Sequence, residues 1–347
     1  MNQYLVGLKD AKAQSLSVSG GKGASLARLH GISDIPVPDG FVVTTQCFME
    51  IVWALPEIKT LLGALAKVTE DQTGIIRNIS GQMKEHIEHI TFPASFTSEL
   101  DETLSAYGAS FSYAVRSSAT AEDLPGASFA GQQDTFLNIH GAADICHAIA
   151  KCWASLFNDR AIAYRIKNGF QHDKVTIAVV IQRMVDSEVS GVLFTADPMT
   201  SDRYTTVIEA VRGLGEDLVS GRKTPFEWKL REGELEKRGD GQEAAPLADT
   251  RLLELAEIGK RIETAFGCEQ DIEWCYENGQ FFIVQARPIT TLYPRPESPD
   301  GYKHCALSVG HLQMMTDTVL PLGTSMLQKS NFFGHGTWRT YVHGYYL

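Results

Sequence analysis

The clearest alternation of apolar and polar residues runs from residue 271 to residue 287, on both sides of the dipeptide Asn278-Gly279. Asn-Gly between two alternating runs is a strong indication of a β-hairpin. Successive side chains of a strand point to opposite faces, so a three-residue loop over residues 278–280 leaves one face of the hairpin wholly apolar. The opposed pairs on that face are then Ile272–Ala286, Trp274–Val284 and Tyr276–Phe282.

The other face of this hairpin is polar. Asp271 then opposes Arg287, and Glu273 opposes Gln285. A two-residue turn would shift the register by one residue and mix the two faces, so we expect the longer loop or a β-bulge. An acid, an amide and an arginine on one face are suited to hold a metal ion and a phosphate. The same residues also suit an exposed face with a cross-strand ion pair, and this stretch alone does not decide between the two.

The rest of the chain mixes strand and helix patterns. Short apolar runs predict strands at residues 41–45, 113–116, 134–139, 175–181, 190–195 and 206–209. Helical spacing predicts helices at residues 24–29 and 252–266, and one long amphipathic helix across residues 145–163. Residues 48–107 have a helical pattern with breaks at Pro56 and Pro93. Together these patterns predict an α+β or α/β fold.

The character of the sequence changes after Arg287. Four prolines, at 288, 294, 296 and 299, predict a stiff and extended connector. We therefore expect a first domain over residues 1–291, a proline-rich linker over residues 292–303, and the incomplete start of a second domain over residues 304–347. The last segment is too short to form a core of its own.

Composition narrows the class of protein. With 44% hydrophobic and 21% charged residues, the chain is an ordinary soluble globular protein, and its net charge of -11 argues against a nucleic-acid partner. The sequence begins without the basic and apolar blocks of a signal peptide, and no apolar run is long enough to span a membrane. The six cysteines form no C-x-x-C pair, which favours reduced thiols in a cytoplasm over disulfides or a zinc site.

A glycine-rich turn at residues 18–23 contains Lys22 and precedes the helix predicted at residues 24–29. Glycines permit close approach of the backbone to an anion, and the next helix offers its N-terminal N–H groups. Lys22 would add a positive charge on the phosphates. The turn is not a Walker A motif, because Gly23 follows the lysine. The alternative is a glycine-rich turn with a solvated lysine.

Arg116 ends a predicted strand and precedes a loop of small residues at 117–131. Such a loop suits a lid over phosphates, with Arg116 binding phosphate oxygens in bidentate fashion. The alternative is a disordered surface loop. Gln182 closes another apolar strand, where its amide could hydrogen-bond an adenine base; a glutamine at the edge of the core explains it equally well.

Several motifs together resemble one family. In chain order they are Gly-Gly-Lys-Gly-Ala-Ser-Leu, Val-Pro-Asp-Gly-Phe, Val-Arg-Ser-Ser-Ala-Thr-Ala-Glu-Asp, Ser-Phe-Ala-Gly-Gln, Gly-Val-Leu-Phe-Thr and Gln-Ala-Arg-Pro-Ile-Thr. Across residues 10–291 the chain resembles the nucleotide-binding domain of the pyruvate phosphate dikinase and phosphoenolpyruvate synthase family. This resemblance implies an ATP-grasp fold, in which two α+β lobes clasp ATP and Mg²⁺, and phosphoryl transfer to a histidine on a separate, swivelling domain.

The segment from Leu307 to Gly323 is similar to the opening of the antibiotic-binding domain of rifampin phosphotransferases. Enzymes of that group use ATP and water to phosphorylate a hydroxyl of the antibiotic, giving AMP and phosphate. Two alternatives stay open. One is the front end of a phosphoenolpyruvate synthase with pyruvate as the acceptor, and the other is a nucleotide-binding regulatory module without chemistry of its own.

The resemblance also implies roles for individual residues. Lys22, Arg116 and Arg287 would bind phosphates, and Glu273 and Gln285 would coordinate Mg²⁺. The remaining positions are Gly131 and Thr135 under the lid loop and Gln182 at the adenine.

One departure from the family is clear. The phosphohistidine lies in a Gly- and Thr-rich motif followed by His-Ala-Ala, and these 347 residues contain no such segment. We therefore expect no catalytic residue in this chain, which should bind Mg-ATP without completing transfer to the antibiotic. By this resemblance the chain is either a front fragment or a shortened relative.

Overall fold

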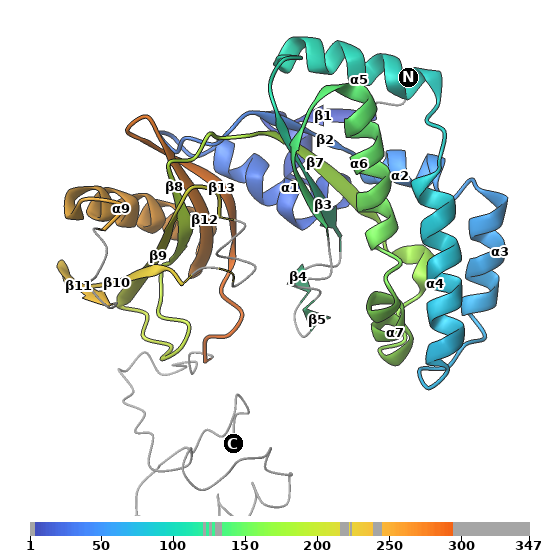
Figure 1. Ribbon diagram of the computed structural model, residues 1–347. Coiled ribbons are helices and arrows are strands. Elements are labelled where there is room, and N and C mark those ends of the chain that lie inside the picture. Colours follow the sequence, from blue (N-terminus) through green and yellow to red (C-terminus); the bar gives the residue numbers. More distant parts are fainter. Residues whose placement is uncertain are drawn as a thin grey trace, which may run out of the picture. The chain divides into compact units, whose positions relative to one another are not determined.

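A computed structural model describes residues 4–120, 123–124, 127–128, 134–215, 222, 224–238 and 245–293 (Figure 1). Helices and strands alternate irregularly, which confirms a mixed α+β fold. The strands are β1 (Leu5–Gly7), β2 (Gly40–Val43), β3 (Tyr113–Ala119), β4 (Asp123–Leu124), β5 (Ala127–Ser128), β6 (Thr135–Ile139), β7 (Ile177–Arg183), β8 (Val189–Phe194), β9 (Thr205–Arg212), β10 (Phe226–Arg231), β11 (Glu234–Arg238), β12 (Gln270–Glu277) and β13 (Gln280–Pro288). The helices are α1 (Leu16–His30), α2 (Thr45–Ile51), α3 (Pro56–Leu65), α4 (Thr73–Glu88), α5 (Ala94–Tyr107), α6 (Gly141–Ser155), α7 (Asp159–Lys167) and α9 (Asp249–Phe266), with short 3-10 turns at Ala11–Gln14 and His172–Lys174.

The first sheet has the strand order β1-β2-β7-β3-β6, and all of its neighbouring strands are antiparallel. Its central strand β7 is apolar and buried on both faces as far as Gln182, which explains the continuous apolar run in the sequence. Helices α2 to α6 cover one face, where Phe48, Trp53 and Trp153 meet edge to face (Figure 1). Strand β3 extends to Ala119, three residues beyond the predicted end.

The prediction of one long helix across residues 145–163 is wrong. The chain forms α6 and α7 with a break at Leu156, Phe157 and Asn158. Asn158 has a non-helical backbone conformation, with φ −56° and ψ 142°, and is the N-cap residue of α7. The buried guanidinium of Arg165 donates to the Leu156 carbonyl at 2.7 Å, so a carbonyl left free by the end of α6 is satisfied.

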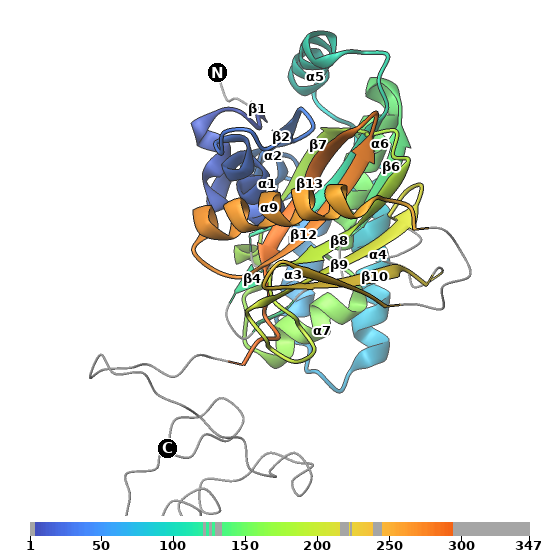
Figure 2. The same ribbon diagram turned by 90° about the vertical axis from the view of Figure 1, so that its left-hand side faces the viewer.

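The second sheet has the order β11-β10-β9-β8-β12-β13, and helix α9 packs across it (Figure 2). The apolar stripe of α9, including Leu252, Leu255 and Ile262, is buried against the sheet. Gly267 ends the helix in a left-handed conformation, as a glycine past the last helical turn commonly does.

Helix α1 connects the two sheets. Its residues Leu26 and Leu29 belong to one core that also contains Val180 of the first sheet and the inner face of the second. Ser25 Oγ donates to the Ala286 carbonyl of β13 at 2.5 Å. Arg28 donates to the carbonyl before Phe266 and lies over its ring at 4.3 Å from the centroid. The same helix that carries Lys22 therefore fixes the hairpin of the second sheet.

The predicted hairpin is present, with a bulge in place of the longer loop. Glu277 pairs with Gln280, so the turn has two residues; Asn278 and Gly279 both have positive φ, as a type I′ turn requires. The register then shifts between Glu273 and Trp274, which leaves Val284 as the extra residue.

Because of this bulge, two of the three pairs predicted on the apolar face are wrong. Ile272 opposes Ala286 as expected, whereas Trp274 opposes Ile283 and Tyr276 opposes Phe281. Residues 281–284 are all apolar, so alternation could not locate the face there, and the Asn-Gly turn set the register. On the polar face, Asp271–Arg287 and Glu273–Gln285 are opposed as predicted.

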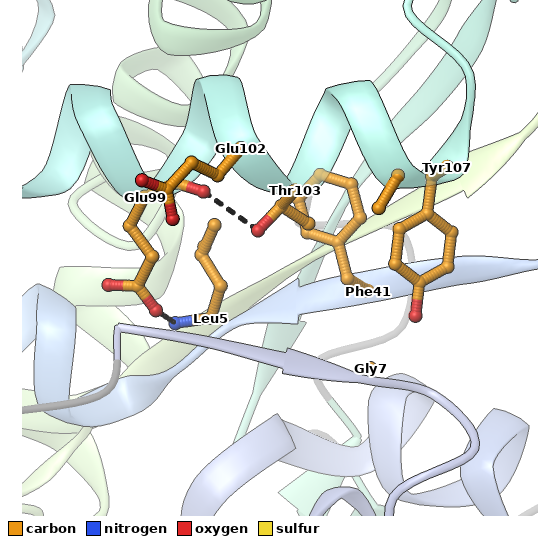
Figure 3. A pocket seen from close by; sticks show the side chains of 8 residues that line it. Leu5, Gly7, Phe41, Glu99, Glu102, Thr103 and Tyr107 are labelled. Carbon is orange, nitrogen blue, oxygen red and sulfur yellow. Dashed lines mark hydrogen bonds between the residues drawn. The ribbon is translucent and has the colours of Figure 1, made fainter.

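A cavity of about 330 Å³ lies between α5 and the edge strand β1 (Figure 3). Its lining includes Leu5, Phe41 and Tyr107, and one carboxylate of the lining, Glu99, accepts from the backbone N–H groups of Tyr4 and Leu5. Helix α5 thereby satisfies donors of a sheet edge that would otherwise be open to pairing with another chain.

Contacts divide the chain into two units, and the first comprises Met1–Asp197 with Arg203–Ile289. The second comprises Pro198–Asp202 and the residues from Thr290 onward; in its described part, the Tyr293 N–H donates to Ser201 Oγ. The predicted linker beyond Tyr293 and the predicted second domain at 304–347 lie outside the described residues, so this division stays a prediction. Among the described helices, none has the length and apolar character needed to cross a membrane.

Candidate functional site

The turn predicted at residues 18–23 is a kink inside α1. Gly20 has φ 66° and ψ −176°, while the residues on both sides are helical. A Cβ at Gly20 would lie 2.0 Å from the Ser118 carbonyl oxygen, so the kink needs both the positive φ and the missing side chain of glycine. Lys22 follows two residues later and is half-buried. Burial raises the pKa of the Cys152 thiol, and the Lys22 charge opposes that rise.

Arg116 is the centre of a polar cluster between the two sheets. Its side chain leaves β3 and is 11% exposed. The guanidinium donates from Nη1 to the Val284 carbonyl at 2.9 Å, and from Nη2 to Glu273 Oε2 at 2.7 Å and Gln285 Oε1 at 2.9 Å. The structure thus brings together Arg116, Glu273 and Gln285, three of the predicted site residues.

The bulge in β13 has a direct role in this cluster. Val284 is the extra residue of the hairpin, and its carbonyl is the acceptor for Arg116 Nη1. A bulge leaves one residue without a ladder partner and redirects its groups, so the Val284 oxygen is available to a side chain from another sheet. The bulge was one of two predicted outcomes, but the contact of its carbonyl with Arg116 was not foreseen.

Glu273 and Gln285 fit a divalent cation. Their oxygens converge on one positively charged atom, Arg116 Nη2, from opposed positions on neighbouring strands. Mg²⁺ prefers oxygen ligands and is commonly held by one or two carboxylates together with substrate phosphates. Among the described residues, no group of three His, Cys, Asp or Glu side chains is placed to hold a metal ion.

Arg287 lies beside this cluster on β13. Its Nε and Nη2 both lie 2.9 Å from Asp271 Oδ2, and 42% of its side chain is exposed. Burial raises the pKa of Asp271, the charge and hydrogen bonds of Arg287 lower it, and the Glu273 carboxylate raises it again. The guanidinium is therefore anchored by one carboxylate and still reaches solvent, where an anion could approach it.

Thr135 is placed next to Arg116, because the two residues are paired between β6 and β3. Its side chain is exposed. The second position expected under the lid loop, Gly131, lies outside the described residues.

Gln182 is not brought into the cluster around Arg116. Its side chain is 2% exposed, and Nε2 donates to the Pro38 carbonyl at 3.4 Å. The residue lies at the end of β7, where Gly40 and Ala114 are its partners on the two neighbouring strands. These contacts agree with the interpretation as a core-edge glutamine, and a role at an adenine stays a prediction.

The sequence did not single out two further residues, Glu209 and Ser118. Glu209 of β9 is opposed to Glu227 of β10, and burial followed by the Glu227 and Asp271 carboxylates raises its pKa. Ser118 lies two residues after Arg116 on the same strand and contacts the Gly20 kink. The Arg-Ser-Ser-Ala run gave the only hint of Ser118, since small polar residues at the end of an apolar strand are uncommon.

The chain belongs to the family described as "Pyruvate phosphate dikinase, AMP/ATP-binding domain", whose model matches residues 16–238 and 229–301. It is therefore an ATP-binding domain of the dikinase type, and this membership supports the ATP-grasp class expected from the sequence.

Individual relatives include rifampicin phosphotransferases. The chain is 45% identical over 348 residues to the one from Bacillus cereus and 44% identical to the one from Bacillus subtilis, with 94% of the chain covered in both. It is 40% identical over 313 residues to "Probable phosphoenolpyruvate synthase" of Archaeoglobus fulgidus, with 82% of the chain covered. The chain spans about 40% of the length of these curated relatives.

Among solved structures, D-alanine-D-alanine ligase from Helicobacter pylori matches with a TM-score of 0.27 and 9% identity. The match covers 55% of this chain and 42% of the ligase, and a score this low supports no conclusion about the chain.

Proposed function

We propose that the chain is the ATP-binding portion of a rifampin phosphotransferase that uses Mg-ATP. The complete reaction would convert ATP, rifampin and water into AMP, phosphorylated rifampin and phosphate, through a phosphohistidine on a swivelling domain. Family membership supports ATP as the nucleotide, and the rifampicin phosphotransferases among the relatives support the acceptor. The observation that carries the proposal is the convergence of Glu273 and Gln285 on the cationic Arg116.

In this proposal each residue of the cluster has a part in the chemistry. Glu273 and Gln285 would hold Mg²⁺, which when bound neutralises charge on the phosphates. Arg116 would turn its guanidinium from these two oxygens to phosphate oxygens, for which its planar fork is well suited. Lys22 and Arg287 would add positive charge at the phosphates, as transfer of a phosphoryl group requires. Arg287 stays oriented by Asp271 during this exchange.

The remaining predicted residues complete the nucleotide site. Thr135, next to Arg116, and Gly131 would contact the phosphates under the lid loop, and Gln182 would border the adenine region.

Titration calorimetry with ATP, with and without MgCl₂, tests this site. We expect Lys22→Ala to weaken ATP binding at every Mg²⁺ concentration, because a phosphate charge partner is lost. Glu273→Ala should remove most of the Mg²⁺ dependence. Glu254→Ala, which breaks an exposed ion pair with Arg251, is the matched control and should leave both quantities unchanged. Unchanged ATP affinity and metal dependence in both site variants would refute the proposal.

The acceptor needs a separate experiment. The runner-up is a phosphoenolpyruvate synthase with pyruvate as the acceptor, favoured by relatives such as that of Archaeoglobus fulgidus. Joining this chain to the remaining domains of a rifampicin phosphotransferase and comparing rifampicin with pyruvate separates the two. The non-enzyme alternative is tested by isotope exchange between ATP and labelled phosphate. If no exchange is detected even after the histidine domain is added, a regulatory nucleotide-binding module is favoured instead.

A further inference from the structure

We propose that Ser118 is a positioning residue for the phosphates of ATP: its hydroxyl sets the conformation of the glycine-rich turn that carries Lys22. The inference rests on the proposed function, because it assigns the turn to the phosphates. It concerns a residue that touches neither nucleotide nor metal in that proposal and acts through the backbone of α1.

The Ser118 hydroxyl lies inside the hydrogen-bond ladder of α1. In an uninterrupted helix the N–H of Gly23 donates to the carbonyl of Ser19, four residues earlier. Here the Gly23 N–H donates to Ser118 Oγ at 3.0 Å, and Ser118 Oγ donates to the Ser19 carbonyl at 2.6 Å. The Ser118 hydroxyl, which comes from β3, thus replaces one backbone hydrogen bond of α1. Insertion of a side chain into the hydrogen bonds of a helix is a known cause of kinks.

The kink and the inserted hydroxyl depend on each other. Gly20 lies between the two bonded groups and adopts the positive φ at which the helix kinks. The backbone of Ser118 fills the space beside Gly20, where a Cβ would meet its carbonyl oxygen at 2.0 Å. Ser118 is fully buried, so no solvent water competes for either bond.

This arrangement links the two cationic groups of the proposed phosphate site. Ser118 and Arg116 are two residues apart on β3, so their side chains leave the same face of the strand. Lys22 lies between Gly20 and Gly23, within the segment that the Ser118 hydroxyl bridges. One short piece of β3 therefore fixes Arg116 directly and Lys22 through the turn.

A purely structural serine would stabilise the fold without affecting nucleotide binding, and a matched control separates these roles. Ser80 is also buried in the first unit, and its Oγ donates to the Phe157 carbonyl at 2.6 Å, away from the site. We expect Ser118→Ala to weaken ATP binding about tenfold in calorimetry. Ser80→Ala should lower the urea midpoint of unfolding by about as much as Ser118→Ala does. It should leave the dissociation constant for ATP unchanged.

A double-mutant cycle with Lys22→Ala tests the link to the lysine. In the Lys22→Ala background, Ser118→Ala should weaken ATP binding less than threefold, because the group that the turn positions is already absent. Ser118→Cys keeps a small side chain with a weaker donor and should give an intermediate affinity; it also serves as the test variant if Ser118→Ala does not fold.

The outcomes distinguish this inference from the proposed function. Failure of the unmutated chain to bind ATP would overturn the proposed function itself. If the unmutated chain binds ATP, equal affinity in Ser118→Ala, or equal losses with and without Lys22, would overturn the role of Ser118 alone.

Discussion

Removing the carboxylate of Glu273 should destabilise the ligand-free protein far more than removing an exposed carboxylate. The side chain of Arg116 is 11% exposed and that of Glu273 is 25% exposed, and Arg116 Nη2 lies 2.7 Å from Glu273 Oε2. Loss of a hydrogen bond to a charged group costs about 1.5–3 kcal/mol, and an unpaired charge in a fully buried pair costs about 3–5 kcal/mol. Arg116 keeps Val284 and Gln285 as acceptors, so we expect Glu273→Ala to lower the free energy of unfolding by about 2 kcal/mol.

The matched control for this prediction is Glu254→Ala. The Arg251–Glu254 pair is equally short, at 2.6 Å, but its side chains are 42% and 45% exposed. Exposed pairs contribute about 0–1 kcal/mol, and salt screens them. Urea unfolding followed by far-UV circular dichroism avoids a fluorescence artefact from Trp274, the neighbour of Glu273. Equal losses of unfolding free energy in the two variants would refute the reasoning. So would a Glu273→Ala effect that disappears in about 0.5 M salt, where exposed pairs are well screened.

Two further predictions concern pH. Burial lowers the pKa of His172 to about 4, below its ordinary value of 6.5, so the unfolded chain binds the proton more tightly and stability should fall as the pH drops through that window. His172→Gln, which can still accept from Arg165, should reduce this acid-side loss; urea midpoints at pH 7 and pH 4.5 check it, and an unchanged difference would contradict it. Burial and the neighbouring carboxylate of Glu227 raise the pKa of Glu209 above 4.5, so the folded state holds that proton more tightly and stability should fall as the pH rises through the raised pKa. Glu209→Gln should therefore be more stable than the unmutated chain at pH 7 and lose this advantage near pH 4, whereas an advantage independent of pH would show that charge is not its cause.

The sequence predicted those parts of the fold that depend on local pattern. Strands and the hairpin follow from alternation and from the Asn-Gly turn, which act over a few residues. The opposition of Glu273 to Gln285 follows from alternation at the base of the hairpin together with the bulge, because the two-residue turn alone would shift the register by one residue. The break between α6 and α7 was not predicted, because apolar spacing continues across Asn158 while Arg165, nine residues later, binds the Leu156 carbonyl at the end of the first helix. Helical periodicity alone does not report such caps.

Contacts between distant segments could not be predicted in the same way. The glycines around Lys22 suggested a turn, but the kink within a helix depends on Ser118, which comes nearly a hundred positions later in the chain. A phosphate role for Arg116 stays a prediction, whereas its contacts with Glu273 and Gln285, which come from another sheet, were not predicted. Such contacts depend on how both sheets pack around α1. No local pattern in a single sequence predicts that packing.

The bulge at Val284 divides the hairpin into two stretches whose alignments are set independently. Toward the tip, the Asn278-Gly279 turn determines which side chains face each other; toward the base, Asp271 and Arg287 do so. A change in the length of the tip during evolution would be absorbed at the bulge before it reached Glu273 and Gln285. The tip of the hairpin can therefore vary while its base stays constant, and a foreign peptide grafted at the tip should leave Glu273 and Gln285 in place.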